Sequence, residues 1–152
     1  MLVLGISLFA FSAVQTADEM SPVSEAQARE LFAEYDKRGL ASDPAEADVH
    51  CEDGRIIMFQ EDESGHVRRL EGSAARYKEI LRASAAEARQ AGDYSTLSDV
   101  TFHRAGSGIR VEATRYSMAR KYESPATFLI SHCGTGEIGI MEMTVHTKPA
   151  PK

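Results

Sequence analysis

The C-terminal third of the chain alternates apolar and polar residues, and this alternation constrains the fold more than any other feature of the sequence. It begins near Ser98 and is interrupted at Gly106-Ser107, at Lys121-Tyr122 and at residues 134–136. A period of two is typical of strands with one buried face, and short interruptions of this kind join antiparallel neighbours. The sequence therefore predicts a four-strand antiparallel meander.

The turns set the register of this meander, because the numbers of two opposed residues in a hairpin have a constant sum. The first turn places Ser98 opposite Arg115, and the second places Arg115 opposite Phe128. The third turn places Phe128 opposite Glu142. One face of the sheet then carries most of the apolar side chains, namely Val100, Phe102, Ile109, Val111, Ala113, Phe128, Ile130, Ile138 and Ile140.

In this register Arg115 and Glu142 share the apolar face, two strands apart. Neighbouring strands are about 4.8 Å apart, so the two backbones are separated by roughly 10 Å, a gap that two long side chains can close across Phe128. A guanidinium removed from water needs a carboxylate or a ligand anion, because an unpaired buried charge is costly. Two interpretations follow: the pair closes one end of the core, or it contacts a ligand.

The first half of the chain predicts two helices. Residues 24–39 place apolar side chains at helical spacing, with Ser24 as the N-cap and Gly39 at the end. Residues 73–91 repeat this spacing and are followed by Gly92, which is typical of a helix end. The sequence therefore predicts one helix on each side of the intervening segment.

Between these helices the sequence favours extended structure. After a polar segment over residues 41–47, we expect strand over residues 49–60, broken by a turn at Asp53-Gly54. A short strand follows over residues 66–70. Together with the helices and the meander, these segments predict a single α+β domain.

The N-terminal residues 2–14 form an uncharged apolar run. The run is too short to span a bilayer as a helix and is similar to the apolar region of a secretory signal peptide. We therefore expect a signal peptide and flexible lead over residues 1–20, the domain over residues 21–148 and a tail over residues 149–152. The mature protein is expected to be periplasmic or secreted. The alternative is a first strand or helix buried in the domain.

The composition bears on the number of domains and on the class of partner. A chain of 152 residues that is 43% hydrophobic and 26% charged is typical of one globular domain. Its net charge of −6 gives no basic surface of the kind that nucleic-acid-binding proteins use. We therefore expect no nucleic-acid partner, and no membrane contact beyond the signal peptide.

The two cysteines each follow a histidine, in His50-Cys51 and His132-Cys133, an arrangement that invites a metal site. Adjacent residues of a strand point to opposite faces, so both members of a pair cannot easily meet one ion, and we expect no metal. If the chain is exported, Cys51 and Cys133 can form a disulfide. Two unpaired thiols are the alternative.

The chain also carries local marks of a known family. These are Arg115-Tyr116-Ser117, Ser124-Pro125 and the pattern Gly136-x-Ile138-x-Ile140-x-Glu142. With the order of helix, broken strands, helix and long meander, residues 23–148 resemble the nuclear transport factor 2-like superfamily, which includes SnoaL-like and ketosteroid isomerase-like proteins. The resemblance implies a cone-shaped α+β domain, in which a curved mixed or antiparallel sheet wraps around N-terminal helices and forms a cavity for small apolar or amphipathic ligands.

This resemblance implies a conical cavity with polar groups at its floor and aromatic walls. The expected ligand-binding residues are Arg115, Glu142, Tyr35, Tyr77, Phe102 and Phe128. Family members that isomerise or dehydrate place an Asp or His base against tyrosines, and no such set is matched here residue by residue. Glu142 is only a weak candidate for an acid or base, because Arg115 beside it would favour the charged form.

We therefore expect an exported domain that binds an amphipathic or anionic small molecule, without catalysis and without a cofactor. One alternative is an enzyme of the isomerase, dehydratase or cyclase type that uses Glu142 as its acid or base. A second alternative is an interaction module whose cavity is filled by its own side chains.

The opposite face of the meander predicts an interface. Its apolar residues are Leu129, Met141, Met143 and Val145. An apolar patch on the outer face of a sheet usually marks an interface. Relatives commonly dimerise through this surface, so the resemblance implies a homodimer. The alternative is a patch covered by the chain's own N-terminal segment.

Overall fold

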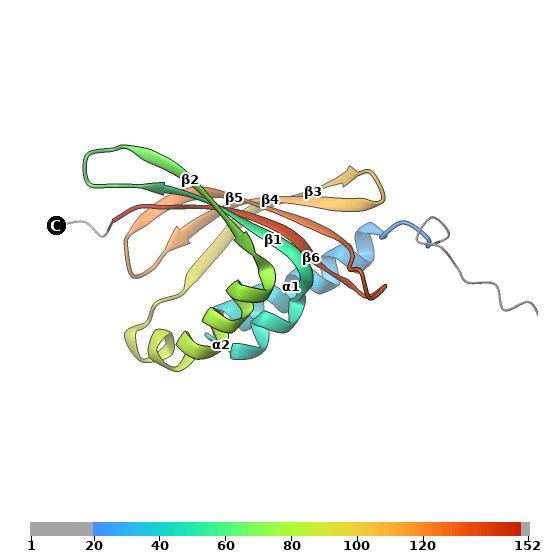
Figure 1. The fold of residues 1–152 in the computed structure, drawn as a ribbon, viewed down its shortest axis with the longest axis horizontal. Coiled ribbons are helices and arrows are strands. Elements are labelled where there is room, and N and C mark those ends of the chain that lie inside the picture. The colour runs from blue at the N-terminus through green and yellow to red at the C-terminus, as the bar shows by residue number, and fades with distance from the viewer. Residues whose placement is uncertain (1–19, 150–152) are drawn as a thin grey trace, which may run out of the picture.

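The computed structural model describes residues 20–149. The predicted signal peptide, apart from Met20, and residues 150–152 lie outside this part of the chain. Two helices, a short 3₁₀-helix and six strands form the domain, and both helices lie on the same side of the twisted sheet (Figure 1). This confirms the predicted α+β domain. No helix within residues 20–149 is long and apolar enough to cross a membrane.

The two predicted helices form close to their expected ends. α1 spans Glu25–Leu40, and Ser24 caps it in a capping box with Gln27. α2 spans Ala74–Ala91 and ends at Gly92, whose φ of 64° lies in the left-handed region that glycine adopts without steric cost. Local sequence signals therefore determined both helices.

A third helical element was not predicted. The 3₁₀-helix η2 spans Pro44–Val49, within and just after the segment expected to be an irregular connection. The side chain of Asp43 accepts the backbone N–H of Ala45, and the proline stands in the first turn, where its missing N–H has no cost. η2 contacts both α1 and α2, and it carries Glu46.

The sheet contains six strands in the order β2-β1-β6-β5-β4-β3. Their bounds are β1 His50–Glu61, β2 Val67–Ser73, β3 Ser95–Ala105, β4 Gly108–Ser117, β5 Tyr122–His132 and β6 Ile138–Thr147. β1 and β6 run parallel and the other neighbours are antiparallel, so the sheet is mixed and β3–β6 are the predicted meander. The turn predicted at Asp53-Gly54 is wrong, because both residues lie within β1.

The first hairpin of the meander keeps the predicted register only near its turn. Phe102 opposes Val111 as expected. An irregularity lies between Ser98 and Thr101, and it makes Leu97 rather than Ser98 the partner of Arg115. The predicted row of residues across the sheet is therefore wrong at this strand.

The second hairpin has an earlier turn than predicted. β4 ends at Ser117 and β5 begins at Tyr122, so Arg115 opposes Ser124 rather than Phe128. The two registers differ by an even number of residues. Because side chains alternate with a period of two, the predicted face of Phe128 is unchanged.

The third hairpin has the predicted register only as far as Ile140. Met141 is an extra residue in β6, and beyond it Phe128 opposes Met143 instead of Glu142. A one-residue slip moves every later side chain of the strand to the other face. Glu142 therefore leaves the apolar face, and Met143 enters it.

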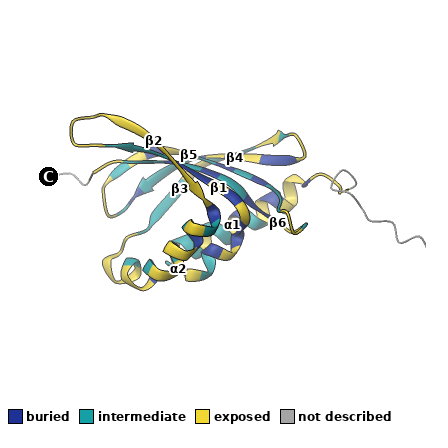
Figure 2. Cartoon of the chain, in the orientation of Figure 1, coloured by how far each residue is buried: buried dark blue, intermediate teal, exposed yellow. Residues whose placement is uncertain are grey.

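The hydrophobic core lies between the helices and the inner face of the sheet, where buried residues are concentrated (Figure 2). Phe128, Ile130 and Ile140 are almost completely buried there. Met143 and Val145 belong to the same core, with only 2% and 9% of their surface exposed. These two residues were predicted on the outer face, and that placement is wrong because of the β-bulge.

A disulfide joins Cys51, near the start of β1, to Cys133, directly after β5. The two Cα atoms are 5.3 Å apart and the residues are 82 positions apart in the sequence. Of the two states that the sequence left open, the structure contains the bonded one. The bond ties the first strand of the sheet to the last hairpin.

Candidate functional site

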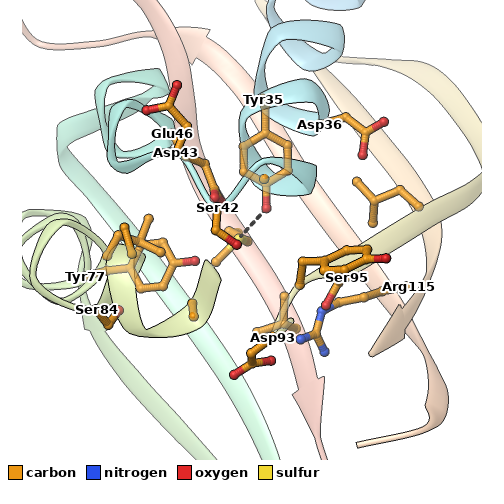
Figure 3. Close-up of a pocket in the computed structure, with 18 of the residues that line it drawn as sticks. Tyr35, Asp36, Ser42, Asp43, Glu46, Tyr77, Ser84, Asp93, Ser95 and Arg115 are labelled. Carbon is orange, nitrogen blue, oxygen red and sulfur yellow. Dashed lines mark hydrogen bonds between the residues drawn. The ribbon is translucent and has the colours of Figure 1, made fainter. Parts of the chain in front are cut away.

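A cavity of about 310 Å³ lies between the helices and the inner face of the sheet (Figure 3). Four of the six residues predicted to bind a ligand line it: Tyr35, Tyr77, Arg115 and Phe128. They come from α1, α2, β4 and β5, which are far apart in the sequence. The cavity thus lies between the helices and the sheet, where the family resemblance implied one.

Glu142 is not in this cavity, and its predicted pairing with Arg115 is wrong. Its Oε2 lies 2.6 Å from Nη2 of Arg55, which also reaches Glu71 on β2. The cause is the β-bulge at Met141, which turns Glu142 to the outer face. The sequence-based candidate for an acid or base is therefore a surface ion pair.

Phe102 is the second predicted residue that does not line the cavity. Its ring packs at right angles to that of Phe32, with 6.0 Å between the centroids. The guanidinium carbon of Arg29 lies 4.2 Å from the centroid of Phe102, so the ring also makes a cation–π contact. Phe102 is part of the core beneath α1 instead of a ligand contact.

Arg115 is the cation of the cavity, and it has no carboxylate partner. Its Nη1 donates one hydrogen bond, 3.3 Å long, to the carbonyl oxygen of His146. No carboxylate oxygen within residues 20–149 lies within 4.0 Å of its nitrogens, as the ion pairs of this part of the chain all involve other residues. A guanidinium carries several donors, so most of its hydrogen-bonding capacity is unused.

Tyr35 and Tyr77 supply two phenol groups to the cavity. The hydroxyl of Tyr35 donates to Sδ of Met143 at 3.6 Å, and its ring lies 5.2 Å from that of Phe128. The hydroxyl of Tyr77 has no hydrogen-bond partner among residues 20–149. Burial, followed by the negative charge of Glu46, raises the pKa of both phenols, whereas the charge of Arg115 acts in the opposite direction. Both hydroxyls therefore stay protonated at neutral pH.

Glu46 is a cavity residue that the sequence did not single out. It lies in η2, and its carboxylate makes no hydrogen bond or ion pair within the described part of the chain. Burial, and secondly the charge of Asp43, raise its pKa from 4.5 to about 7. Near neutral pH this carboxyl group can therefore either accept or donate a proton. The Asp43-Pro44 pair, a helix start signal, was the available clue to this element.

Behind the two tyrosines lies His50, the first residue of β1. Its ring is edge-on to Tyr35 and Tyr77, at centroid distances of 5.8 and 5.2 Å. It is 3% exposed, and neither ring nitrogen has a hydrogen-bond partner. Burial, and secondly the charge of Lys78, lower its pKa from 6.5 to about 4. His50 is therefore a neutral packing residue at the back of the aromatic wall.

One cluster of side chains has the ligand types and spacing that a metal ion requires. Within residues 20–149 the ligand atoms of Cys51, Asp53 and Cys133 lie within 4.8 Å of one another. The two sulfurs are bonded to each other, and Asp53 accepts the backbone N–H of Gly134 at 3.0 Å. While the disulfide is present, this group offers no thiolate to a metal.

Comparison with known proteins identifies the fold. No family model matches the sequence, and no curated protein matches it either. A nuclear transport factor 2-like protein of unknown function from Pseudomonas putida KT2440 matches in structure with a TM-score of 0.56 and 13% identity, covering 79% of this chain and 83% of that one.

Two further solved structures match this chain with similar scores. The β subunit of the benzoate 1,2-dioxygenase from Burkholderia mallei has a TM-score of 0.54 and 13% identity, covering 84% of this chain and 92% of its own. A protein of the same fold family from Streptomyces avermitilis, proposed to be a dehydratase, has a TM-score of 0.53 and 13% identity, covering 84% and 96%. At these identities the likeness concerns the fold alone.

Proposed function

Because this chain has the nuclear transport factor 2-like fold, we propose that it binds a small amphipathic molecule with an anionic group in the cavity between its helices and its sheet. The anionic group, such as a carboxylate, contacts Arg115. The apolar body packs against Phe128 and the rings of Tyr35 and Tyr77. Binding itself involves no chemical step.

The unpaired guanidinium of Arg115 is the observation that carries this proposal. A cation at the wall of a partly apolar cavity is costly unless an anion meets it. Within residues 20–149 no carboxylate does so, and the single bond to the carbonyl of His146 leaves donors unused. A ligand carboxylate can accept two parallel N–H groups from a guanidinium, which fixes its orientation.

The size and lining of the cavity limit the ligand. Its volume of about 310 Å³ is at the small end of the range for ligand sites, roughly 300–1,000 Å³. Met58, Leu97 and Val145 add aliphatic surface to the aromatic walls. These features favour a compact ligand with an apolar body. The presence of this volume argues against the alternative of a cavity filled by the chain's own side chains.

We also propose that the domain is exported. The disulfide between Cys51 and Cys133 supports this, because disulfides persist in oxidising compartments and are rare in the cytosol. The apolar run at residues 2–14 supports it independently. The run lies outside the described residues, so the support comes from its composition.

Calorimetry with a carboxylate and its uncharged counterpart tests the binding proposal. We expect 4-methylbenzoate to bind the wild-type protein, and 4-methylbenzamide to bind much more weakly. Arg115→Gln should weaken the binding of 4-methylbenzoate about 10- to 100-fold, the loss expected for a charged hydrogen bond. Arg110→Gln is the matched control, because Arg110 is exposed on the same strand.

The outcome is decided by the difference between these variants. If Arg115→Gln and Arg110→Gln bind 4-methylbenzoate with the affinity of the wild type, Arg115 is not in the site. If a panel of small carboxylates also fails to bind the wild-type protein, the binding function itself is wrong. Melting temperatures of both variants establish that each remains folded.

A second candidate is an enzyme that uses Glu46, rather than Glu142, as its acid or base. The observation that favours it is a carboxyl group with a pKa of about 7 beside the phenol groups of Tyr35 and Tyr77. A group whose pKa is close to the working pH is suited to proton transfer, and a phenol can stabilise a developing enolate.

Exchange of carbon-bound protons tests this second candidate. 4-Oxopentanoate carries a carboxylate for Arg115 and a ketone with acidic neighbouring protons. In deuterated buffer, NMR should show loss of these proton signals faster with the wild-type protein than with Glu46→Gln. Exchange at the solvent rate in the presence of bound 4-oxopentanoate would remove the enzymatic candidate and leave the binding proposal intact.

A further inference from the structure

The polar groups of the cavity are divided between two sides. Figure 3 shows Arg115 on one side and Glu46 on the other, with the hydroxyls of Tyr35 and Tyr77 between them. Both tyrosines are affected by the charges of Glu46 and Arg115, which places each phenol within electrostatic reach of both groups. The cavity therefore has a cationic end and an acidic end.

Neither end is neutralised by the protein. Glu46 and Arg115 make no ion pair with each other or with another residue of the described chain, and Glu46 has no hydrogen bond through its carboxylate. The hydroxyl of Tyr77, which points into the cavity in Figure 3, has no partner there either. Unpaired polar groups that line one partly buried space indicate that a ligand supplies their partners.

Carboxyl groups outnumber cations in the lining of the cavity. Asp36, Asp43 and Asp93 line it together with Glu46, whereas Arg115 is its one cationic lining residue within residues 20–149. Burial raises the pKa of Asp36, as it does that of Glu46, so additional negative charge is unfavourable beside these groups. A ligand that brought only a carboxylate would leave these carboxyl groups uncompensated.

We propose that the natural ligand is a small zwitterion, with a carboxylate bound by Arg115 and a protonated amine bound by Glu46 across an apolar body that packs on Tyr35, Tyr77 and Phe128. This inference rests on the proposed binding function and adds the class of ligand. An ammonium group compensates Glu46 and lies against the rings of the two tyrosines, which attract cations through their faces. The phenol of Tyr77 supplies a further hydrogen bond to either polar group.

Three probes that share one ring test the proposal by isothermal titration calorimetry at pH 7.5. 4-(Aminomethyl)benzoate carries both charges, 4-methylbenzoate carries only the carboxylate, and benzylamine carries only the amine. The wild-type protein should bind 4-(aminomethyl)benzoate at least about fivefold more tightly than either of the other probes, because it gains a charge-assisted hydrogen bond at each end.

Variants test whether Glu46 causes the tighter binding of 4-(aminomethyl)benzoate. In Glu46→Gln the two benzoates should bind with equal affinity, because the amide cannot compensate an ammonium charge. Glu87→Gln is the matched control, since Glu87 is an exposed carboxylate of α2 outside the cavity, and it should keep the wild-type preference. Arg115→Gln should weaken both benzoates and leave benzylamine unchanged.

A measurement without any variant gives a second test. Asp43, the N-cap of η2, is the charged group that acts on the pKa of Glu46. The phenols of Tyr35 on α1 and Tyr77 on α2 lie in the field of Glu46 and of Arg115 on β4, and Asp36 of α1 acts on Tyr35 as well. Lowering the pH from 7.5 to 5.5 protonates Glu46, while the amine and the probe carboxylate keep their charges. The advantage of 4-(aminomethyl)benzoate over 4-methylbenzoate should therefore shrink.

The possible results separate this inference from the function on which it rests. Equal affinities of the two benzoates for the wild-type protein, or a preference that persists in Glu46→Gln, would overturn the zwitterion and leave the role of Arg115 standing. Binding of neither benzoate to the wild-type protein would overturn both. A preference that disappears only in Glu46→Gln and at pH 5.5 supports the proposal.

Discussion

His50 and Glu46 show how the same loss of solvent shifts an acid and a base in opposite directions. Burial disfavours the charged form of each, so the pKa of His50 falls to about 4 and that of Glu46 rises to about 7. As the pH falls from 6.5 to 4.5, protonation of His50 in the unfolded chain lowers the free energy of unfolding, whereas protonation of Glu46 in the folded chain raises it. The unfolded chain binds more protons at His50, whereas the folded chain binds more at Glu46.

His50→Leu should make the protein more resistant to acid. The side chain of His50 takes up a proton near pH 6.5 in the unfolded chain, but only near pH 4 in the folded one. Protonation of the unfolded chain therefore lowers the free energy of unfolding of the wild type as the pH falls from 6.5 to 4. The free energy of unfolding of His50→Leu, relative to the wild type, should rise by about 3 kcal/mol between pH 7.5 and pH 4. Urea titrations across this range measure it, and parallel curves for the two proteins would contradict it.

At the scale of the elements, a single extra residue in β6 determines the chemistry of the cavity. The β-bulge at Met141 removes Glu142 from the inner face and brings Met143 and Val145 into the core. Gly54 of β1 lies against this bulge. A Cβ atom at Gly54 would be only 2.7 Å from the backbone oxygen of Met141, so a side chain does not fit.

Gly54→Ala should therefore destabilise the protein through its contact with the bulge. The added methyl group must displace backbone atoms rather than a flexible side chain, and such overpacking costs about 1–3 kcal/mol. Gly72→Ala on β2 is the matched control, because nothing lies within 4 Å of a Cβ atom there. Urea unfolding should show a lowered midpoint for Gly54→Ala only. Equal midpoints for the two variants would contradict this prediction, because they would mean that the backbone around Gly54 accommodates the methyl group without a loss of stability.

At the scale of the whole molecule, the disulfide joins regions that the sequence separates. The double variant Cys51→Ala/Cys133→Ala should lose about 4 kcal/mol of unfolding free energy, because a closed loop of this length restricts the unfolded chain. Urea unfolding measures the loss. Mass spectrometry after alkylation, with and without reductant, is the control, and labelling of both cysteines without reductant would contradict the bond.

The homodimer predicted from the outer face of the sheet stays a prediction, but only two of the four predicted interface residues remain on the surface. Met143 and Val145 are buried in the core, which leaves Leu129 and Met141, both partly exposed. We expect a dimer at micromolar concentration by analytical ultracentrifugation, and a monomer for Leu129→Glu. Val67→Glu, at a residue that is 50% exposed on edge strand β2, should remain dimeric. A wild-type monomer would contradict the interface.

Much of the fold could be predicted from the sequence because it depends on local patterns. Capping residues and helical spacing gave α1 and α2, and alternation gave the meander and its apolar face. The site was predicted in part: Tyr35, Tyr77, Arg115 and Phe128 line the cavity. Glu46 was missed because it lies in a short 3₁₀-helix, whose start signal at Asp43-Pro44 is weak beside helical periodicity.

The sequence by itself determined which residues are apolar, where α1 and α2 begin and end, and that the last four strands form an antiparallel meander. Only the tertiary structure decided which charges meet. Face assignment along a strand depends on every residue between the turn and the side chain, and one bulge at Met141 is enough to reverse it. Arg115 therefore faces an open cavity with Glu46 across it, while Glu142 pairs with Arg55 outside.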